Sequence, residues 1–435
     1  MNEAYDNHLT RTVTKTEAAP KSDAAAGGVV IKKPDSAQLP AENTKDEKIK
    51  FRKEREYIRI KTSPDRILMV LVLALVCIGS VTVFSASYPY AISQGYDSYY
   101  YVVRQVVFVV IGLILMTVAM RVPYDKYKYL AFGVYGVAMV LLVVVLLIGV
   151  GDESSSVKRW ISIPGINITI QPSEIMKLGL VLLLSWYIGK YAEYIQKGAP
   201  LRLRIIYGVL IPAVIIFVPC GLVLLEKHLS GTIILMAVGI IVLFIGGASV
   251  PWIAAIYGSI GAVAVTVYLS LNSYALQRIL TYFDENADAL NEDWQTTQGL
   301  YSIGSGGLFG LGLGESRQKY GYVSQPQNDF IFTIWCEEMG YIGAVAVVLL
   351  FAALLWRGFI VARRAPDVFS SLVVYGIISH ITLQAILNIM VVTSIIPNTG
   401  ISLPFFSYGG SSLVMLMGEM GIVLSVSCHS RQQKL

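Results

Sequence analysis

The sequence predicts an all-α, polytopic membrane protein, and three observations lead to that fold class. Hydrophobic residues make up 55% of the 435 residues and charged residues only 14%, whereas a soluble domain has roughly 25% charged residues. The charges are also uneven, because they gather in the first 66 residues and between long apolar stretches. Those stretches match the roughly 20 apolar residues that a helix needs to cross a bilayer.

About ten stretches qualify as membrane-spanning helices, which places both termini on one side of the membrane. The expected spans are residues 67–87, 102–120, 129–150, 174–190, 203–220, 230–247, 251–271, 329–356, 368–392 and 410–428. If the basic N-terminal segment is cytoplasmic, the inner loops hold most of the remaining Lys and Arg, as the positive-inside rule requires. The expected outer loops are 88–101, 151–173, 221–229, 272–328 and 393–409. The largest of them, 272–328, lies between the seventh and eighth helices.

The first 64 residues differ in composition from the apolar region that follows. They are rich in Ala, Lys, Asp, Glu and Pro and contain no long apolar run, so we expect no cleavable signal peptide. This composition predicts a disordered cytoplasmic tail ahead of a transmembrane domain over 65–430. Its basic end is interpreted as a topogenic flank, with binding to anionic lipid or to a partner protein as the alternative.

The net charge of +5 does not indicate nucleic-acid binding, because basic residues beside membrane helices serve topology and lipid headgroups. The four cysteines and four histidines are scattered and show no metal-ligand spacing. We therefore predict no transition-metal site and interpret the cysteines as small buried apolar residues, at Cys77, Cys220, Cys336 and Cys428.

Asp329 is the strongest candidate for acid/base chemistry. It lies in Gln325-Pro-Gln-Asn-Asp-Phe-Ile-Phe332, where the polar outer loop meets the eighth predicted helix. An N-cap role suits a carboxylate at the positive helix end, and a general base needs the same ionised, fixed carboxylate, so position alone leaves both interpretations open. Glu337 and Glu338 lie about two turns deeper. At least one of them is expected to be a structural hydrogen-bonding partner.

Ionisable residues inside a membrane span are costly and are functional candidates by default. Glu174 and Lys177 stand three residues apart at the start of the fourth span, in Gln171-Pro-Ser-Glu-Ile-Met-Lys177. They share a helix face and can pair. The pair either neutralises itself near the interface or organises a polar cavity that opens to the outer leaflet, where Gln171 and Ser173 would join it.

Positive charge also gathers on the outer side. Arg104 lies near the outer end of the second span, and Lys158 and Arg159 lie in the next outer loop. Separated cations facing outward could bind a diphosphate, which Arg recognises bidentately. Snorkelling toward the membrane surface explains each of them individually as well.

Two glycine-containing outer segments complete the candidates. The run from Gly304 to Gly314 could cradle phosphate with backbone N–H groups, or it could be a loop packed closely on the membrane domain; the sequence holds no GxxxxGK[ST] pattern. The segment 397–412 joins the last two spans. Irregular backbone at membrane depth is tolerated only when it is buried or lines a cavity, so we expect a site wall, with a passive turn as the alternative. Its candidate substrate-binding residues are Asn398, Ser407, Gly409, Gly410 and Ser411.

Together these segments resemble the SEDS family (shape, elongation, division and sporulation). The matching pieces run in family order over residues 67–428 and comprise 158–165, 171–177, 298–314, 328–332 with Glu337 and Glu338, and 397–412. Within the family the chain resembles the FtsW/SpoVE branch more than RodA, on residues 316–320, 326–329 and 397–400. It departs from the family at Glu226-Lys-His-Leu-Ser-Gly-Thr232, where His228 replaces a common Asp, so we expect no catalytic role for that loop.

The resemblance implies a peptidoglycan glycosyltransferase of the bacterial cytoplasmic membrane. The expected reaction polymerises lipid II and releases undecaprenyl diphosphate. Asp329 matches the aspartate that the family requires, and the expected cellular role is in cell division. The resemblance also implies a complex with a class B penicillin-binding protein that supplies the transpeptidase, alongside other membrane proteins of the division complex. No resident cofactor is implied, although Mg²⁺ or Mn²⁺ is compatible with the charge of the leaving group.

Two rival functions remain open from the sequence: a transporter that flips lipid II, and a non-catalytic scaffold of the division machinery. About ten spans with intramembrane charges suit a transporter as well. A flippase, however, needs a polar route that reaches the cytoplasmic side, and the candidate charges gather toward the outer face.

Overall fold

The structure is a computed structural model, and it describes residues 57–151, 158–163, 168–196, 198–271, 276–277 and 294–433. The expected N-terminal tail up to residue 56 and most of the outer-loop region 272–293 lie outside the described residues. The same holds for residues 152–157 and 164–167 of the second expected outer loop.

Long helices dominate the described part of the chain. They are α1 (Arg66–Ser93), α2 (Tyr100–Arg121), α3 (Tyr127–Ile148), α4 (Pro172–Lys190), α7 (Ile211–Leu225), α8 (Leu229–Ile245), α9 (Val250–Leu271), α12 (Ile331–Arg364), α13 (Val368–Val392) and α14 (Gly410–Ser427). Shorter helical segments are η1 (Tyr124–Lys126), α5 (Ala192–Ile195), α6 (Leu201–Ile205), the π-helical turn η2 (Ile206–Leu210) and α11 (Trp294–Ser305). Each predicted span coincides with one of the long helices.

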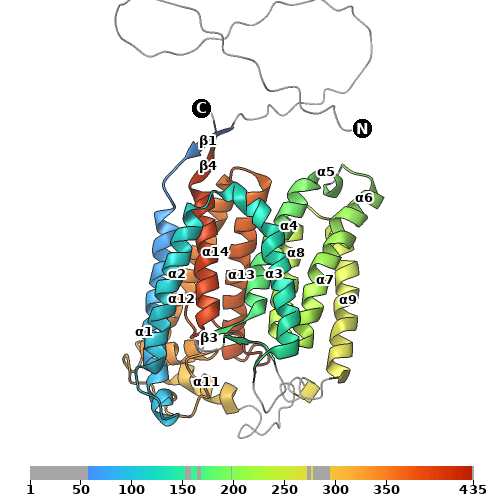
Figure 1. Ribbon diagram of the computed structural model, residues 1–435. Coiled ribbons are helices and arrows are strands. Elements are labelled where there is room, and N and C mark those ends of the chain that lie inside the picture. The colour runs from blue at the N-terminus through green and yellow to red at the C-terminus, as the bar shows by residue number, and fades with distance from the viewer. Residues whose placement is uncertain are drawn as a thin grey trace, which may run out of the picture. The chain divides into compact units, whose positions relative to one another are not determined.

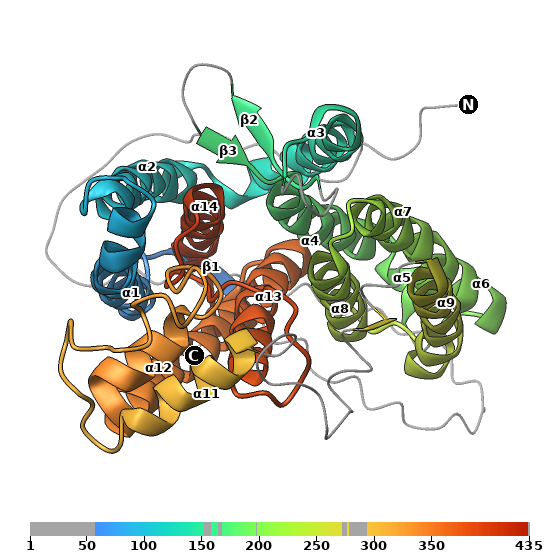
Figure 2. The ribbon, with the colours of Figure 1, turned by 90° about the horizontal axis from the view of Figure 1, so that it is seen from below.

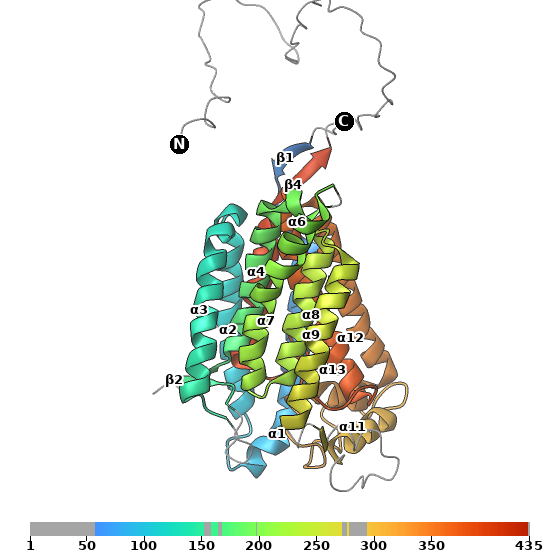
Figure 3. The same cartoon turned by 90° about the vertical axis from the view of Figure 1, so that its right-hand side faces the viewer.

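Eight helices within the described residues are long and apolar enough to cross a membrane, with α6, η2 and α7 forming one continuous span. The shorter apolar helix α8 has 17 residues, and α4 carries Glu174 and Lys177 in its first two turns. Figures 1 and 3 show α4 and α8 running alongside the long helices. The prediction of an all-α, multi-pass membrane protein is therefore confirmed.

The centre of the bundle is formed by α4, α13 and α14. In their most apolar stretches, 67% of α14 is buried but only 11% of α9, as expected if α9 faces lipid on most of its surface. Viewed along the helices, α14 lies between α2, α4 and α13, and α7, α8 and α9 form a flanking group (Figure 2). The central position of α4, α13 and α14 matters for function because all three carry polar residues at one end.

Successive helices alternate in direction, so the connections gather at two opposite ends of the bundle (Figure 1). One end holds the α2–α3 and α12–α13 turns, and there β1 (Tyr57–Lys61) pairs antiparallel with β4 (His429–Gln433). Residues 57–61, which the composition places in the expected tail, therefore form a strand. The other end holds the hairpin of β2 (Ile161–Ile163) with β3 (Ile168–Ile170) and helix α11, so the segment 272–328 is not entirely loop.

The glycine-rich run 304–314 packs against a break in α12. Gly340 interrupts that helix with a φ of +66° and a ψ of −166°. A Cβ added at Gly310 would lie 2.1 Å from the carbonyl oxygen of Glu338, so no side chain fits there. The backbone N–H groups of Leu311 and Gly312 donate to the carbonyl oxygens of Glu337 and Glu338. Close packing on the membrane domain therefore explains Gly310, and the N–H groups of Leu311 and Gly312 are already bonded to α12.

Candidate functional site

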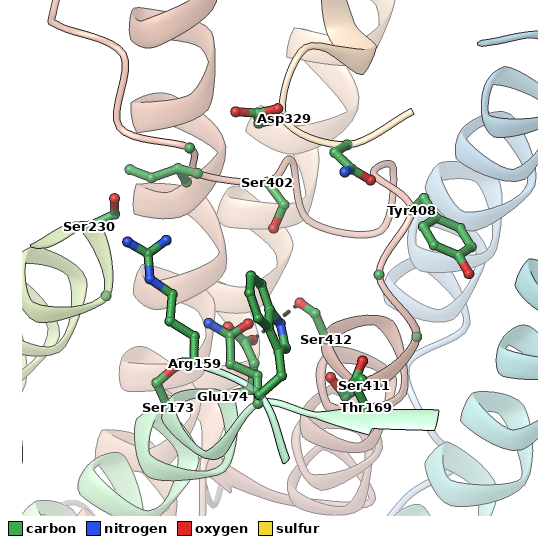
Figure 4. Close-up of a pocket in the computed structure, with 18 of the residues that line it drawn as sticks. Arg159, Thr169, Ser173, Glu174, Ser230, Asp329, Ser402, Tyr408, Ser411 and Ser412 are labelled. Atoms are coloured by element: carbon green, nitrogen blue, oxygen red, sulfur yellow. Dashed lines mark hydrogen bonds between the residues drawn. The ribbon is translucent and has the colours of Figure 1, made fainter. Parts of the chain in front are cut away.

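A polar cavity of about 420 Å³ opens at the end of the bundle that holds β2, β3 and α11. Residues from α2, the 158–171 segment, α4, the start of α8, the turn before α12, α13 and the 400–412 segment line it. Figure 4 shows Asp329 and Ser402 at one wall, Glu174, Ser411 and Ser412 toward the other, and Arg159 between them. The cavity therefore lies where segments far apart in the sequence converge.

Asp329 reaches this cavity from the turn that precedes α12. Its carboxylate faces the irregular 393–409 segment, since a Cβ added at Gly400 would lie 3.7 Å from Oδ2 of Asp329. The N-cap position of α12 is Phe330, which makes no side-chain capping bond. The N-cap interpretation of Asp329 is thus wrong: the helix starts two residues later than the prediction placed it, at Ile331, and the carboxylate is directed to the cavity.

Glu174 and Lys177 form the predicted pair, with 2.8 Å between Oε1 and Nζ. Both side chains are buried and both line the cavity. Lys177 also donates to Oε1 of Gln384 at 2.9 Å, and Nε2 of Gln384 donates to the carbonyl of Ser402 at 3.0 Å. Ser412 donates to Oε2 of Glu174 at 3.2 Å. This network joins α4, α13, α14 and the irregular 393–409 segment, so the pair organises the cavity rather than only neutralising itself.

Two of the predicted cations line the cavity. The guanidinium of Arg104 stacks on the ring of Tyr100, 4.2 Å from its centroid, and hydrogen-bonds Tyr408. Burial raises the pKa of Tyr408 despite that bond, so the phenol stays protonated and can donate. Arg159 donates from Nη2 to the carbonyl of Lys227 at 2.5 Å, which ties the β2–β3 side of the site to the turn between α7 and α8.

The α7–α8 turn contributes a neutral imidazole. His228 lines the cavity, and Nε2 of Gln171 lies 3.4 Å from its Nδ1. Burial and the nearby charge of Arg159 lower the pKa of His228 to about 3. The sequence departure at this turn therefore puts an uncharged hydrogen-bonding group, not a carboxylate, at the edge of the site.

Most of the predicted site residues converge on the cavity. Those that line it are Arg104, Arg159, Gln171, Ser173, Glu174, Lys177, Asp329, Gly409, Gly410 and Ser411. The buried hydroxyl of Ser173 has no hydrogen-bond partner within the described part of the chain, so it is available to a ligand.

Three predicted binding residues lie outside the cavity lining. Lys158 is exposed and does not line the cavity, although its neighbour Arg159 does. Ser407 is buried and accepts from the backbone N–H of Leu403 at 2.8 Å. Asn398 accepts from the backbone N–H of Gly400 at 3.1 Å. The last two residues therefore shape the 397–407 segment rather than face the cavity.

Several lining residues were not among the sequence candidates. Two kinds stand out: aromatic and hydroxyl residues of the converging loops, and uncharged amides inside a span. The lining residues without a sequence prediction include Trp160, Thr169, Ser230, Gln325, Asn328, Gln384, Ser402, Tyr408 and Ser412. An amide in the middle of α13 is a detectable signal, but the rule applied to the spans counted only ionisable residues.

Glu337 and Glu338 hold the outer loop to α12 and do not line the cavity. Glu337 accepts from Oγ of Ser316 at 2.6 Å and from Oγ of Ser302 at 2.9 Å. Glu338 pairs with Lys319, with 3.0 Å between Oε1 and Nζ. Both carboxylates are fully buried, so the expectation of a structural hydrogen-bonding role is met.

A resident metal has no evident ligand cluster in the described ranges, where no group of three or more His, Cys, Asp or Glu side chains could hold an ion. The carboxylates that line the cavity are Glu174, already paired with Lys177, and Asp329. This donor set fits a cation bound by one carboxylate and by the phosphates of a substrate, which is a common arrangement for Mg²⁺.

Sequence comparison finds relatives over nearly the whole membrane domain. The profile of the FtsW/RodA/SpoVE family, described as "Cell cycle protein", matches residues 65–432. "Stage V sporulation protein E" of Bacillus subtilis (strain 168) is 37% identical over 374 residues, which cover 85% of this chain and 99% of that protein. "Probable peptidoglycan glycosyltransferase FtsW" of Trichlorobacter lovleyi is 34% identical over 365 residues, which cover 83% and 93%.

Solved structures share the fold. A chain of the structure "Structural coordination of polymerization and crosslinking by a peptidoglycan synthase complex" matches with a TM-score of 0.68 and 28% identity, over 84% of this chain and 97% of that chain. The rod shape determining protein RodA of Thermus thermophilus matches with a TM-score of 0.61 and 27% identity, over 84% and 96%. With the profile match and the relatives above, the chain belongs to the FtsW/RodA/SpoVE family of multi-pass bacterial cytoplasmic-membrane proteins, the SEDS family.

Proposed function

We propose that the chain is a peptidoglycan glycosyltransferase that polymerises lipid II, with Asp329 as its general base. The convergence of Asp329, Arg104 and Arg159 in one polar cavity carries this proposal. A carboxylate can remove a hydroxyl proton, and two guanidinium groups can hold a diphosphate. The names of the FtsW relatives, and the resemblance to a chain of a peptidoglycan synthase complex, support the same reaction.

The proposed transfer step needs only the two substrates and groups that line the cavity. The 4-hydroxyl oxygen of the acceptor sugar attacks the anomeric carbon of a second lipid-linked sugar. The new C–O bond forms as the bond between that carbon and the diphosphate oxygen breaks, and undecaprenyl diphosphate leaves with the electron pair. Asp329 takes the hydroxyl proton, which is worth roughly 10²–10⁴-fold in rate for a positioned base.

The leaving diphosphate would be stabilised by Arg104 and Arg159, because guanidinium groups bind phosphate bidentately. Lys177 is held by Glu174 and Gln384, so we assign it to fixing the cavity wall. The hydroxyl of Ser173 and the neutral His228 would hydrogen-bond uncharged parts of the substrate. A divalent cation, Mg²⁺ or Mn²⁺, would neutralise phosphate charge if it arrives with the substrate.

The proposed topology has ten spans, with α4 and α8 joining the eight helices that are long and apolar enough to cross a membrane and both termini in the cytoplasm. The alternation of the helices supports it, because the basic α2–α3, α4–α6 and α12–α13 connections share one end of the bundle (Figure 1). The cavity then faces outward. We also propose a complex with a class B penicillin-binding protein and a role in cell division. The similarity to a sporulation protein makes sporulation the alternative to division.

The test is polymerisation of labelled lipid II by the purified full chain, with its class B partner, in detergent. Detergent offers no membrane across which lipid II could be flipped, so any glycan polymer must come from glycosyltransferase activity. Asp329→Asn should remove polymer formation, while the matched control Asp97→Asn, at an exposed residue of the α1–α2 loop, should keep it. Full activity of Asp329→Asn would refute the catalytic assignment. No polymer from the unaltered chain with Mg²⁺ or Mn²⁺ would favour the flippase or scaffold.

A further inference from the structure

A second cavity, of about 300 Å³, lies at the opposite end of the bundle from the proposed active site. The segment before α1, the first turn of α1, the last turns of α12 and the end of α14 enclose it. Its lining residues include Thr62, Asp65, Arg66, Arg357, Arg364 and Ser427. Three guanidinium groups and one carboxylate therefore share a small space, and the proposed glycosyl transfer uses none of them.

The charges in this cavity are not balanced. Nε of Arg357 donates to both oxygens of Asp65, at 3.0 and 2.9 Å, and its Nη2 lies 2.8 Å from Oδ2. Asp65 also caps α1 by accepting from the backbone N–H of Leu68 at 3.0 Å. Across the described ranges, Arg66 and Arg364 take part in no salt bridge. The carboxylate is thus committed to Arg357, and two exposed guanidinium groups remain for an anion.

Apolar side chains form one part of the lining of this cavity. Ile67, Ile360 and Val361 line it together with the arginines. Ile67 is 55% exposed, and Val70, one turn further along α1, is 60% exposed, as expected for side chains that face lipid. A ligand with a negatively charged head and an apolar chain would match both the arginines and this exposed strip of α1.

We propose that this cavity binds the phosphate headgroup of an anionic glycerophospholipid, with an acyl chain against Ile67 and Val70. Arg guanidinium groups bind phosphate oxygens bidentately, and basic pockets between transmembrane helices on the cytoplasmic side are suited to anionic headgroups. In the proposed topology this end of the bundle faces the cytoplasm. A free phosphate ion shares the charged part of this chemistry but not the apolar part.

Lipid in this cavity would hold the two ends of the membrane domain together. Thr62 donates from Oγ1 to the carbonyl of Ser427 at 3.0 Å, and the backbone N–H of Asp65 donates to Oγ of Ser427 at 3.0 Å. The start of α1 and the end of α14 therefore meet beside the cavity. A ligand that binds only the folded protein raises its melting temperature by mass action.

The experiment uses the purified full chain in detergent, titrated with phosphatidylglycerol, with phosphatidylcholine of the same acyl chains, or with inorganic phosphate. Thermal melting and native mass spectrometry report stabilisation and bound lipid. Phosphatidylglycerol should raise the melting temperature and stay bound, whereas phosphatidylcholine and phosphate should not. The double variant Arg66→Gln/Arg364→Gln should weaken phosphatidylglycerol binding by roughly tenfold or more, because each lost guanidinium removes charge-assisted hydrogen bonds to the phosphate.

The matched control is Arg121→Gln/Arg363→Gln, which removes two exposed arginines at the same end of the bundle that do not line the cavity. It should bind phosphatidylglycerol as the unaltered chain does. Equal weakening in both double variants would indicate that the lipid is attracted by surface charge in general and not bound at this cavity. Equal effects of both lipids, or stabilisation by inorganic phosphate alone, would overturn the proposal even if a variant folded poorly, because these titrations use the unaltered chain.

Discussion

Asn388 of α13 donates from Nδ2 to the backbone carbonyl of Asp329 at 2.7 Å. The same amide nitrogen donates to the carbonyl of Ile401 at 2.6 Å, and Asn388 is fully buried. One side chain therefore fixes the turn that carries the proposed base to the irregular segment that faces it. Gln384, one turn away on the same helix, accepts from Lys177 through Oε1 and donates to the carbonyl of Ser402 through Nε2.

Replacing Asn388 with Leu should lower kcat by about 10- to 100-fold with little change in KM. The reason is that a misplacement of about 1 Å at a reacting group can cost that much, while the substrate contacts remain. Steady-state polymerisation of lipid II well below the melting temperature measures both constants. Asn388→Gln keeps an amide donor and should recover part of kcat. A lower melting temperature with unchanged kcat would make Asn388 structural only.

The two arginines of the cavity, Arg104 and Arg159, should matter far more than Lys158, which precedes Arg159 in sequence. Arg104→Gln or Arg159→Gln should each lower kcat/KM by roughly 10- to 100-fold, the cost of about 1.5–3 kcal/mol for one charge-assisted hydrogen bond. Lys158→Gln is the matched control, because Lys158 is exposed and outside the lining, and its effect should stay within about twofold. Equal losses at Lys158 and Arg159 would mean that overall outer charge, not a site, attracts the substrate.

The membrane-spanning helices could be predicted because each is encoded by a long local apolar run, and the observed ends differ from the predicted ones by at most eight residues, at the end of α12. The Glu174–Lys177 pair was also local, since a spacing of three residues puts both on one helix face. Helix α11 was missed because a short, mainly polar helix inside a loop gives no such signal. The pairing of β1 with β4 joins residues from opposite ends of the domain, which no local pattern indicates.

Individual site residues were predictable from the sequence only where the residue type and its local position were enough to indicate a role. Asp329 was named as a candidate, but its N-cap interpretation failed because the exact start of α12 decides it. Arg159 and Lys158 are equivalent in sequence, and only the fold separates them, because it places Arg159 in the cavity lining and leaves Lys158 exposed. Gln384 and Asn388 were missed because their function depends on which loop carbonyls come to lie beside α13, and this is set by tertiary packing.

Breaking the buried ion pair of Lys319 and Glu338 should strongly lower the stability of the folded protein. Their side chains are 3% and 0% exposed, and Lys319→Met would leave Glu338 buried without its cation, which costs about 3–5 kcal/mol. Lys128→Met is the control, because Lys128 and its partner Asp367 are 32% and 20% exposed, and such pairs are worth roughly 0–1 kcal/mol. Thermal melting in detergent should show a much larger drop for Lys319→Met. Equal drops would indicate that water reaches Glu338.

Glu226, at the turn between α7 and α8, should make stability depend on pH. It is 2% exposed, and neither carboxylate oxygen has a hydrogen-bond partner within the described part of the chain. Burial raises the pKa of Glu226 to about 8 from 4.5, against the opposing charge of Arg159. Between these values the folded state binds more protons than the unfolded state, so stability from this group falls as pH rises.

His228 acts in the opposite direction in a lower pH range, so the two groups can be separated. Its pKa falls from 6.5 to about 3 in the folded protein, so its neutral form favours folding above pH 6.5 and this contribution is lost as pH falls. Between pH 6.5 and about 8, Glu226 is therefore the one of the two that still titrates. Over that interval the melting temperature of the unaltered chain should fall relative to that of Glu226→Gln. The exposed control Glu315→Gln should melt in parallel with the unaltered chain. If Glu226→Gln also melts in parallel, the carboxyl of Glu226 is already ionised at pH 6.5 and is solvated or paired in the folded protein.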